Sequence, residues 1–264
     1  MSLLVKANPS GREIVQVTPA SAGWRYVGFS AFRLAPGENL EFAANDREHC
    51  VVVLSGVVTV SSDSLYYREI GERQSVFEER SPYAVYLPNG RPLHITAHSA
   101  AEIGLASAPG QGRHSPRLIE PHSMQRSVRG KALNTRYVCD ILPESEPADA
   151  LLVVEVITPS GHASSYPPHK HDTDNIPQES VLEETYYHRL KPSQGFAFQR
   201  VYTDDRSIDE AMAVEDHDVV MVPRGYHPVV APYGYDAYYL NVMAGPKREW
   251  HFKNDPAHAW IIEQ

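Results

Sequence analysis

Short apolar runs, each followed by a turn sequence, recur along this chain and constrain its fold more than any other feature. Residues 51–54 and 57–60 are rich in valine and flank a Ser-Gly pair, while residues 83–87 end at a Pro-Asn-Gly turn. Such runs at intervals of roughly 8–12 residues are typical of an all-β sandwich or barrel. The sequence therefore predicts an all-β fold, with a helix expected only at residues 207–213.

The chain of 264 residues is long enough for two units of this kind. A Leu-Pro-x-Gly turn at residues 87–90 is echoed by a Val-Pro-x-Gly turn at residues 222–225, which indicates a tandem repeat. Apolar periodicity disappears between residues 108 and 131. We predict an N-terminal unit at residues 1–110, a connecting segment at 111–135 and a C-terminal unit at 136–264.

Composition excludes several kinds of partner. The net charge of −9 and the lack of any lysine- or arginine-rich run argue against nucleic acid and anionic membranes. The apolar runs fall far short of the ~20 residues that a membrane span needs, and the first residues lack the apolar centre of a signal peptide. Two cysteines, Cys50 and Cys139, are too few for a disulfide framework. We therefore expect a cytoplasmic protein.

Histidine is concentrated in the second half, where eight of the 13 lie after residue 160. His169 and His171 are two residues apart, so in a strand both imidazoles point to one face and can bind one ion. Glu184 begins a later run, and His227 follows a Pro-x-Gly turn that can direct it to the same place. Three imidazoles and one carboxylate suit a divalent cation such as Zn²⁺, Mn²⁺ or Fe²⁺. We predict these four residues as metal ligands.

Glu183 is a rival to Glu184 as the carboxylate ligand. Alternation along the run favours Glu184, because it is in phase with Tyr186 and His188. Those two side chains would then share the face of the ligand and line the pocket beside it.

The same positions resemble the two cupin motifs, which run glycine, His-x-His, glutamate, glycine, then Pro-x-Gly, histidine and a later asparagine. The matching residues are Gly161, His169, His171, Glu184, Gly195, Pro223, Gly225, His227 and Asn241. The chain departs from the pattern between His171 and Glu184, where 12 residues stand in place of a much shorter spacer. We expect this insertion, residues 172–182, to loop out and form part of the pocket rim.

One stretch is more specific still. Tyr-Pro-Pro-His-Lys-His at residues 166–171 resembles the 5-deoxy-glucuronate isomerases of bacterial myo-inositol breakdown, as do residues 23–29, 182–187 and 218–228. The resemblance extends over nearly the whole chain. It implies a bicupin, two jelly-roll units in tandem, and isomerisation of 5-deoxy-D-glucuronate to 5-dehydro-2-deoxy-D-gluconate. A related uronate ketol-isomerase of the pectin pathway has a zinc-type site, so Zn²⁺ or Mn²⁺ is the expected cofactor.

The N-terminal unit departs from the motif. Its equivalent stretch, Asp-Arg-Glu-His-Cys at residues 46–50, lacks His-x-His. We therefore interpret residues 1–110 as a cupin without a metal site, and His49 and His94 as structural residues.

The implied reaction moves a carbonyl group between adjacent carbons of a sugar acid through an enediol, which a chelated metal would stabilise. The lone pairs of the metal ligands are engaged, so another group must carry the proton. Tyr186, His188 and Tyr202 are the candidate catalytic residues.

A cation is needed to hold the substrate carboxylate. Arg200 is the first candidate, provided that the even-numbered residues of 196–202 face inward. We favour that phase, although the opposite phase, with the odd-numbered residues inside, would put Arg200 on the surface. Arg136 and Tyr166 are further candidates for substrate binding.

Two other classes of function stay open at this point. The same ligand set can hold Fe²⁺, so a metal-dependent dioxygenase is one alternative. A non-catalytic cupin that binds a sugar acid is the other. A homo-oligomer is also compatible with the sequence, because the edge strands of tandem barrels often pair.

Overall fold

A computed structural model describes residues 2–63 and 65–263. Within the described residues, helices are confined to short segments at α1 (Pro19–Ala22), η1 (Pro121–Ser123), η2 (Ala132–Asn134) and η3 (Ala259–Glu263). The all-β prediction is confirmed. The helix expected at residues 207–213 is wrong, because β21 (Asp209–Glu215) pairs along its whole length with β20 (Phe196–Tyr202).

The chain divides into two compact units, and neither is a single run of sequence. The N-terminal unit comprises Asn8–Gln125 and Asp140–Val153, and the C-terminal unit comprises Met1–Ala7, Arg126–Cys139 and Val154–Gln264. These boundaries differ from the predicted ones at residues 1–7, 111–135 and 140–153. One reason is β1 (Leu4–Val5), which pairs with β22 (Val219–Val222) of the C-terminal unit.

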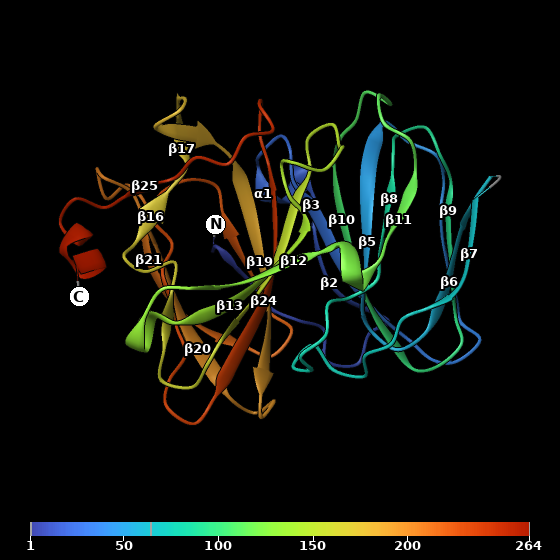
Figure 1. The fold of residues 1–264 in the computed structure, drawn as a ribbon, viewed down its shortest axis with the longest axis horizontal. Coiled ribbons are helices and arrows are strands. Elements are labelled where there is room, and N and C mark those ends of the chain that lie inside the picture. The colour runs from blue at the N-terminus through green and yellow to red at the C-terminus, as the bar shows by residue number, and fades with distance from the viewer. Residues whose placement is uncertain (1, 64, 264) are drawn as a thin grey trace. The chain divides into compact units, whose positions relative to one another are not determined.

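The N-terminal unit contains a six-stranded and a four-stranded antiparallel sheet (Figure 1). Apolar side chains from both sheets form its core, including Val51, Leu87, Ile95 and Leu105. The six-stranded sheet has the order β11 (Arg117–Ile119), β8 (Ala84–Leu87), β5 (Arg47–Ser55), β10 (Ala101–Pro109), β3 (Gly28–Leu34) and β2 (Glu13–Val17). The four-stranded sheet has the order β4 (Asn39–Phe42), β9 (Leu93–Ala97), β6 (Val58–Ser62) and β7 (Leu65–Ile70).

The C-terminal unit is built on a seven-stranded and a four-stranded sheet, with two short ribbons added. The seven-stranded sheet has the order β1, β22, β19 (Glu183–Lys191), β24 (Asp236–Ala244), β14 (Leu152–Thr158), β13 (Arg136–Leu142) and β12 (Gln125–Arg129). The four-stranded sheet has the order β15 (Ala163–Ser164), β23 (Val229–Val230), β20 and β21. The ribbons are β16 (His169–Lys170) with β25 (Lys253–Asn254), and β17 (Asp172–Asn175) with β18 (Glu179–Val181).

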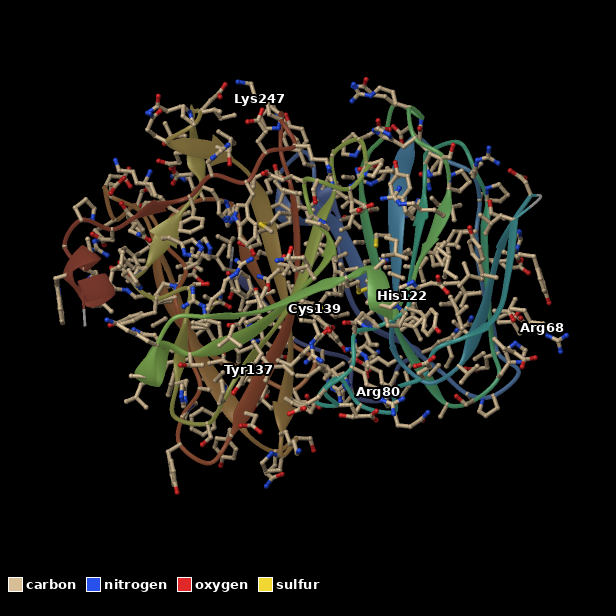
Figure 2. All side chains as sticks on the ribbon, viewed as in Figure 1. Arg68, Arg80, His122, Tyr137, Cys139 and Lys247 are labelled. Carbon is tan, nitrogen blue, oxygen red and sulfur yellow. The ribbon has the colours of Figure 1, made fainter. Side chains whose placement is uncertain are left out.

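Side chains sort by depth as expected for sandwiches of this kind. Charged groups such as Arg68 and Lys247 project from the surface (Figure 2), with more than half of each side chain exposed. Cys50 and Cys139 are both buried, and neither is in a disulfide. No described helix is both long and apolar enough to cross a membrane.

Candidate active site

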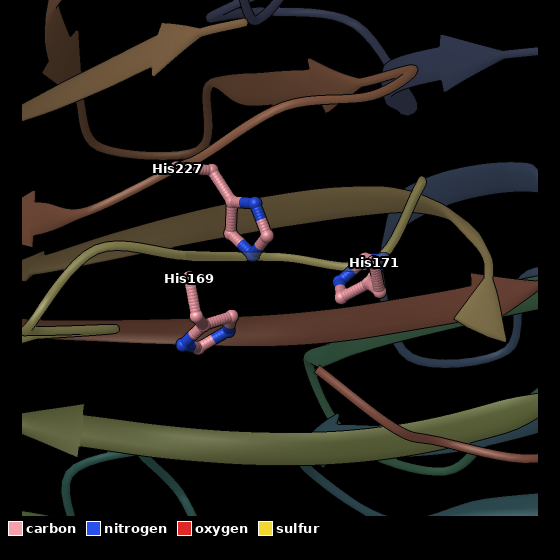
Figure 3. Close-up of side chains that lie close together, drawn as sticks. All are labelled: His169, His171 and His227. Atoms are coloured by element: carbon pink, nitrogen blue, oxygen red, sulfur yellow. The ribbon is translucent and has the colours of Figure 1, made fainter. Parts of the chain in front are cut away.

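Three histidines meet inside the C-terminal unit. His169 lies on β16, whose partner β25 contributes Asn254 opposite it, and His171 follows directly. His227 lies beyond the turn that ends β22. All three are buried, a nitrogen of each lies within 4.8 Å of a nitrogen of the others, and the rings converge (Figure 3).

The turn before His227 requires glycine at position 225. Gly225 has φ +93°, and a β-carbon there would lie 2.5 Å from the carbonyl oxygen of Tyr202. This backbone conformation is easily reached only by glycine. The Pro-x-Gly element of the sequence therefore positions His227 beside His169 and His171.

Backbone carbonyls orient two of the rings. His171 Nδ1 lies 3.0 Å from the carbonyl oxygen of Leu182, and His227 Nδ1 lies 2.9 Å from that of Gly225. A carbonyl only accepts, so Nδ1 carries the proton in each ring and donates it. In the neutral form of each ring, Nε2 then holds a lone pair, the arrangement that metal-binding histidines adopt.

Glu184, on β19, lies beside the Nε2 atoms of these histidines. Its Oε2 is 3.0 Å from His171 Nε2 and 3.3 Å from His227 Nε2, and its Oε1 accepts a hydrogen bond from Asn241. His227 Nε2 is buried and makes no hydrogen bond to any described residue. A divalent cation is bound where lone pairs from several imidazoles and a carboxylate converge in a buried place. The three histidines and Glu184 provide this arrangement, so these residues fit a metal.

Burial sets the protonation of these rings. It lowers the pKa of His227 to about 4, and burial together with the neighbouring imidazoles holds the pKa of His169 well below its usual range. Burial also disfavours the cation of His171, but the hydrogen bond to Glu184 and its charge outweigh that effect and raise the pKa. His169 and His227 are therefore neutral at pH 7, which is the form that binds metals.

A pocket opens beside the triad and extends away from it across the seven-stranded sheet. Its lining residues are Arg129, Arg136, Val138, Val154, Val156, Ser164, Ser165, His169, Glu184, Tyr186, Tyr239, Asn241, Trp250 and Phe252. A wider pocket of about 470 Å³ shares Arg136, His169 and Phe252 with it and adds Tyr166, Pro167 and Ile261. The two pockets place Arg136 and Tyr166, both predicted for substrate binding, near His169.

Two arginines occupy the end of the pocket formed by β13 and β12. Burial lowers the pKa of Arg136, and the positive charge of Arg129 lowers it further. Among the described residues, Arg136 donates one hydrogen bond, to the carbonyl of Asn134, and no carboxylate lies within ion-pairing distance of it. The guanidinium of Arg129 lies 5.6 Å from the ring centre of Trp250. Two neighbouring cations in a partly buried pocket attract an anion such as a carboxylate.

Tyr186 and His188 differ in their access to the pocket. Tyr186 lines it, with its hydroxyl 3.2 Å from that of Ser165, and burial raises its pKa well above the usual range. Its hydroxyl is therefore protonated at neutral pH. His188 is buried beyond Tyr186, with its Nε2 2.9 Å from Gln199 Oε1, and burial lowers its pKa to about 4. His188 does not line the pocket.

The predicted facing of β20 is wrong. Phe198 and Arg200 are exposed, whereas Gln199 and its odd-numbered neighbours are buried. Arg200 makes a two-pronged ion pair with Asp209, both contacts being 2.8 Å. Alternation along the strand left both phases open, and burial of Gln199 against His188 selects the one that turns Arg200 outward.

Tyr202, also a predicted catalytic residue, lies outside the pocket lining. Its hydroxyl donates a hydrogen bond of 2.7 Å to Asp255, and its ring contacts Tyr226. These contacts attach the C-terminal segment to the four-stranded sheet.

The insertion at residues 172–182 forms the β17–β18 hairpin and orients the ligands without lining the pocket. Its last residue supplies the carbonyl that holds His171, and Asp172 accepts a hydrogen bond from the backbone N–H of Gly225. Lys170 points away from the triad, as its position between two inward histidines requires, and contacts Asp172, Glu179 and Asp204. This network ties both histidine segments to one hairpin.

Sequence reasoning missed several of the lining residues. Arg129 lies in the segment predicted as a connection, and Trp250 and Phe252 lie near the C-terminus, where no site residue was predicted. Phe252 packs its ring 4.6 Å from that of His169. Only the basic and aromatic character of these residues could have drawn attention to them, since nothing local indicates that they approach His169.

Two all-β sandwich units in tandem, with a buried histidine triad in the second, define a protein of the bicupin class. An oxalate decarboxylase from Lactobacillus farciminis has the same fold at 12% identity, with a TM-score of 0.69 over 96% of this chain and 88% of the other. The fold class predicted from the sequence is thereby confirmed.

The chain belongs to the KduI/IolB family, which matches residues 3–261. It is 52% identical to a 5-deoxy-glucuronate isomerase of Geobacillus kaustophilus, over 100% of this chain and 96% of the relative. It is 51% identical to that of Bacillus subtilis strain 168, over 94% and 92%. An IolB-like protein from Salmonella typhimurium superimposes with a TM-score of 0.97 at 49% identity, covering 99% of both chains.

Proposed function

We propose that this protein is an aldose–ketose isomerase that converts 5-deoxy-D-glucuronate to 5-dehydro-2-deoxy-D-gluconate in myo-inositol breakdown. The observation that carries the proposal is a single pocket lined by both a histidine of the buried triad and two arginines. Identity of 52% over the full length to a 5-deoxy-glucuronate isomerase supports the same substrate.

The reaction needs different chemistry at the two ends of the substrate. One proton moves from C2 to C1 and one from O2 to O1, so the aldehyde becomes an alcohol and C2 becomes a ketone. Both changes occur within one molecule, and no oxidant or reductant is consumed. The carboxylate at C6 takes no part and serves to hold the substrate in place.

Arg136 and Arg129 bind the C6 carboxylate in this proposal. Burial is the largest cause of the lowered pKa of Arg136, and repulsion from the charge of Arg129 lowers it further. A carboxylate between them removes that repulsion and accepts charge-assisted hydrogen bonds. Arg200, which is already paired with Asp209, has no such role.

His169, His171, His227 and Glu184 would hold a divalent cation, with Zn²⁺ or Mn²⁺ as the preferred ions. When bound there, the ion supplies a Lewis acid that stabilises negative charge on the substrate oxygens. Asn241 fixes the second carboxylate oxygen of Glu184, which keeps the first one directed at the imidazoles. The carboxylate of Glu184 is buried, so water is kept from competing with it for the position of the cation.

Tyr186 acts as a hydrogen-bond donor near the reacting carbons. Its raised pKa keeps the hydroxyl protonated, so it can donate to an oxygen that gains negative charge as the proton leaves C2. A group of this kind stabilises the enediolate without removing the proton itself. His188 supports Tyr186 from behind, with ring centres 6.0 Å apart.

Turnover of the named substrate tests the proposal. The metal-replete protein is incubated with 5-deoxy-D-glucuronate, and the C1 proton of the sugar is followed by NMR. We expect that signal to disappear as the product forms, and in D₂O we expect deuterium at the new C1 methylene. Absence of conversion with Zn²⁺, Mn²⁺ or Fe²⁺ would overturn the assignment, and oxygen uptake by the Fe²⁺ form would favour a dioxygenase.

A cytoplasmic location belongs to the same proposal, and the absence of a disulfide at the two buried cysteines supports it. Homo-oligomerisation stays a prediction from the sequence. Sedimentation of the purified protein measures it directly.

A further inference from the structure

The floor of the pocket changes in polarity from strand to strand. The strands β19, β24, β14, β13 and β12 are neighbours in that order, and each contributes side chains to the pocket. In the same order these are Glu184 and Tyr186, then Tyr239 and Asn241, then Val154 and Val156, then Arg136 and Val138, and finally Arg129. A polar end at the triad is thus separated from a cationic end by an apolar strip.

Three valines make up that strip, and all of them are buried. Val154 and Val156 are two residues apart on β14, and Val138 is two residues from Arg136 on β13. Each pair therefore shares one face of its strand. A valine side chain can neither donate nor accept a hydrogen bond, so a hydroxyl group held above the strip would lose its water without gaining a partner from these residues.

The polar end offers the opposite environment. Asn241 Oδ1 is buried and makes no hydrogen bond to a described residue, so it can accept one from a ligand. Tyr239 and Tyr186 line the same part of the pocket. Sugar hydroxyls are therefore accommodated near the triad and disfavoured beside the arginines.

We infer that Val138, Val154 and Val156 are specificity-determining residues that select a methylene group next to the carboxylate of the ligand. This inference rests on the proposed function and deepens it. With the C6 carboxylate at Arg136 and Arg129 and C1 and C2 near the triad, the deoxygenated C5 lies over the valines. D-glucuronate, which carries a hydroxyl at C5, is then rejected although it is identical elsewhere.

A matched set of substitutions tests the strip. Val154→Thr and Val156→Thr place a hydroxyl in the pocket without changing the size of the side chain. Val153→Thr makes the same change on the other face of β14 and is the control, since Val153 is buried but does not line the pocket. For each metal-replete protein, kcat/KM is measured with 5-deoxy-D-glucuronate and with D-glucuronate.

We expect the unsubstituted protein to prefer the deoxy substrate by about 100-fold, the discrimination that an apolar pocket achieves against an added hydroxyl. Val154→Thr or Val156→Thr should reduce that ratio by about tenfold, and Val153→Thr should leave it unchanged. Equal use of both substrates by the unsubstituted protein overturns the inference, as does an equal change in the ratio with Val153→Thr.

Binding of two acids that do not react separates this inference from the proposed function. Calorimetry compares 2-deoxy-D-gluconate, which has a methylene beside its carboxylate, with D-gluconate. Tighter binding of the deoxy acid, weakened selectively by Val156→Thr, supports the strip whether or not 5-deoxy-D-glucuronate is turned over. Equal affinity for the two acids overturns the strip even if turnover is normal.

Discussion

The two units use the same pairing of strands to build different interiors. In the N-terminal unit, β5 lies between β8 and β10, with His49 opposite Leu87. In the C-terminal unit, β19 lies between β22 and β24, with Glu184 opposite Val222. Each of these partners is followed by proline, so the Leu-Pro and Val-Pro turns match and His49 occupies the place of Glu184.

The inward-facing residues further along β5 and β19 also differ in polarity. Val51 and Val53, which belong to the apolar core, correspond to Tyr186 and His188. On the neighbouring strand, Leu105 pairs with Val51 where Asn241 pairs with Tyr186. The same backbone register therefore supports a closed aliphatic core in one unit and a polar pocket in the other, and the inward-facing side chains of these strands differ accordingly.

The largest effect is expected from removal of a histidine that only the C-terminal unit provides. We expect His227→Ala to abolish stoichiometric metal binding and to lower kcat/KM by at least about 1,000-fold, because the pocket loses a ligand and the Lewis acid it holds. Mass spectrometry of bound metal and steady-state kinetics check this. His94→Ala, at an exposed position of the N-terminal unit, is the control and should retain both. Full metal content in His227→Ala would refute the site.

The next largest effect is expected from substitution of Arg136, one of the two arginines of the pocket. Arg136→Met should raise KM about 100-fold, because a charge-assisted bond to the substrate carboxylate is lost while the aliphatic stem is largely kept. Arg200→Met is the matched control, since Arg200 is exposed and paired with Asp209. We expect its kinetic constants to be unchanged. A similar rise in KM for both variants would show that the substrate carboxylate has been assigned to the wrong arginine.

The pH dependence of stability tests the role of His49, which occupies the position of Glu184 in the N-terminal unit. Burial lowers the pKa of His49 to about 4, so the folded N-terminal unit keeps this ring neutral while the unfolded chain protonates it near its usual pKa of 6.5. The unfolded state binds more protons between these values, so stability falls as pH falls from 6.5 to 4. We expect His49→Gln to remove about 2 kcal/mol of that fall. Denaturant unfolding at pH 7 and pH 4.5 measures it; an unchanged pH dependence would contradict the assignment.

The smallest effect is expected at Tyr186, which replaces a core valine of the other unit. Tyr186→Phe keeps the ring and removes the hydroxyl, so we expect normal metal content and a decrease in kcat of about tenfold. Rapid-quench or NMR kinetics check the rate. An unchanged kcat would show that the hydroxyl does not contact the reacting oxygens.

The sequence by itself determined the all-β class of the fold and which residues could bind a metal. Alternation with a period of two is a local property, so it was sufficient to place Tyr186 and His188 on the face of Glu184. The order His-x-His, glutamate, Pro-x-Gly, histidine located His169, His171 and His227 for the same reason, since their side-chain chemistry is readable without a fold. The helix expected at residues 207–213 failed because pairing with β20 outweighs a weak local preference.

Tertiary structure decided everything that depends on which strands are neighbours. Either face of β20 could have been inward, and only burial of Gln199 beside His188 turned Arg200 to the surface. Arg129 and Arg136 belong to one pocket because β12 and β13 are adjacent in the seven-stranded sheet. Phe252 reaches His169 through the pairing of β25 with β16. Such contacts join segments far apart in sequence, and the burial of a whole sheet selects them, which no local pattern encodes.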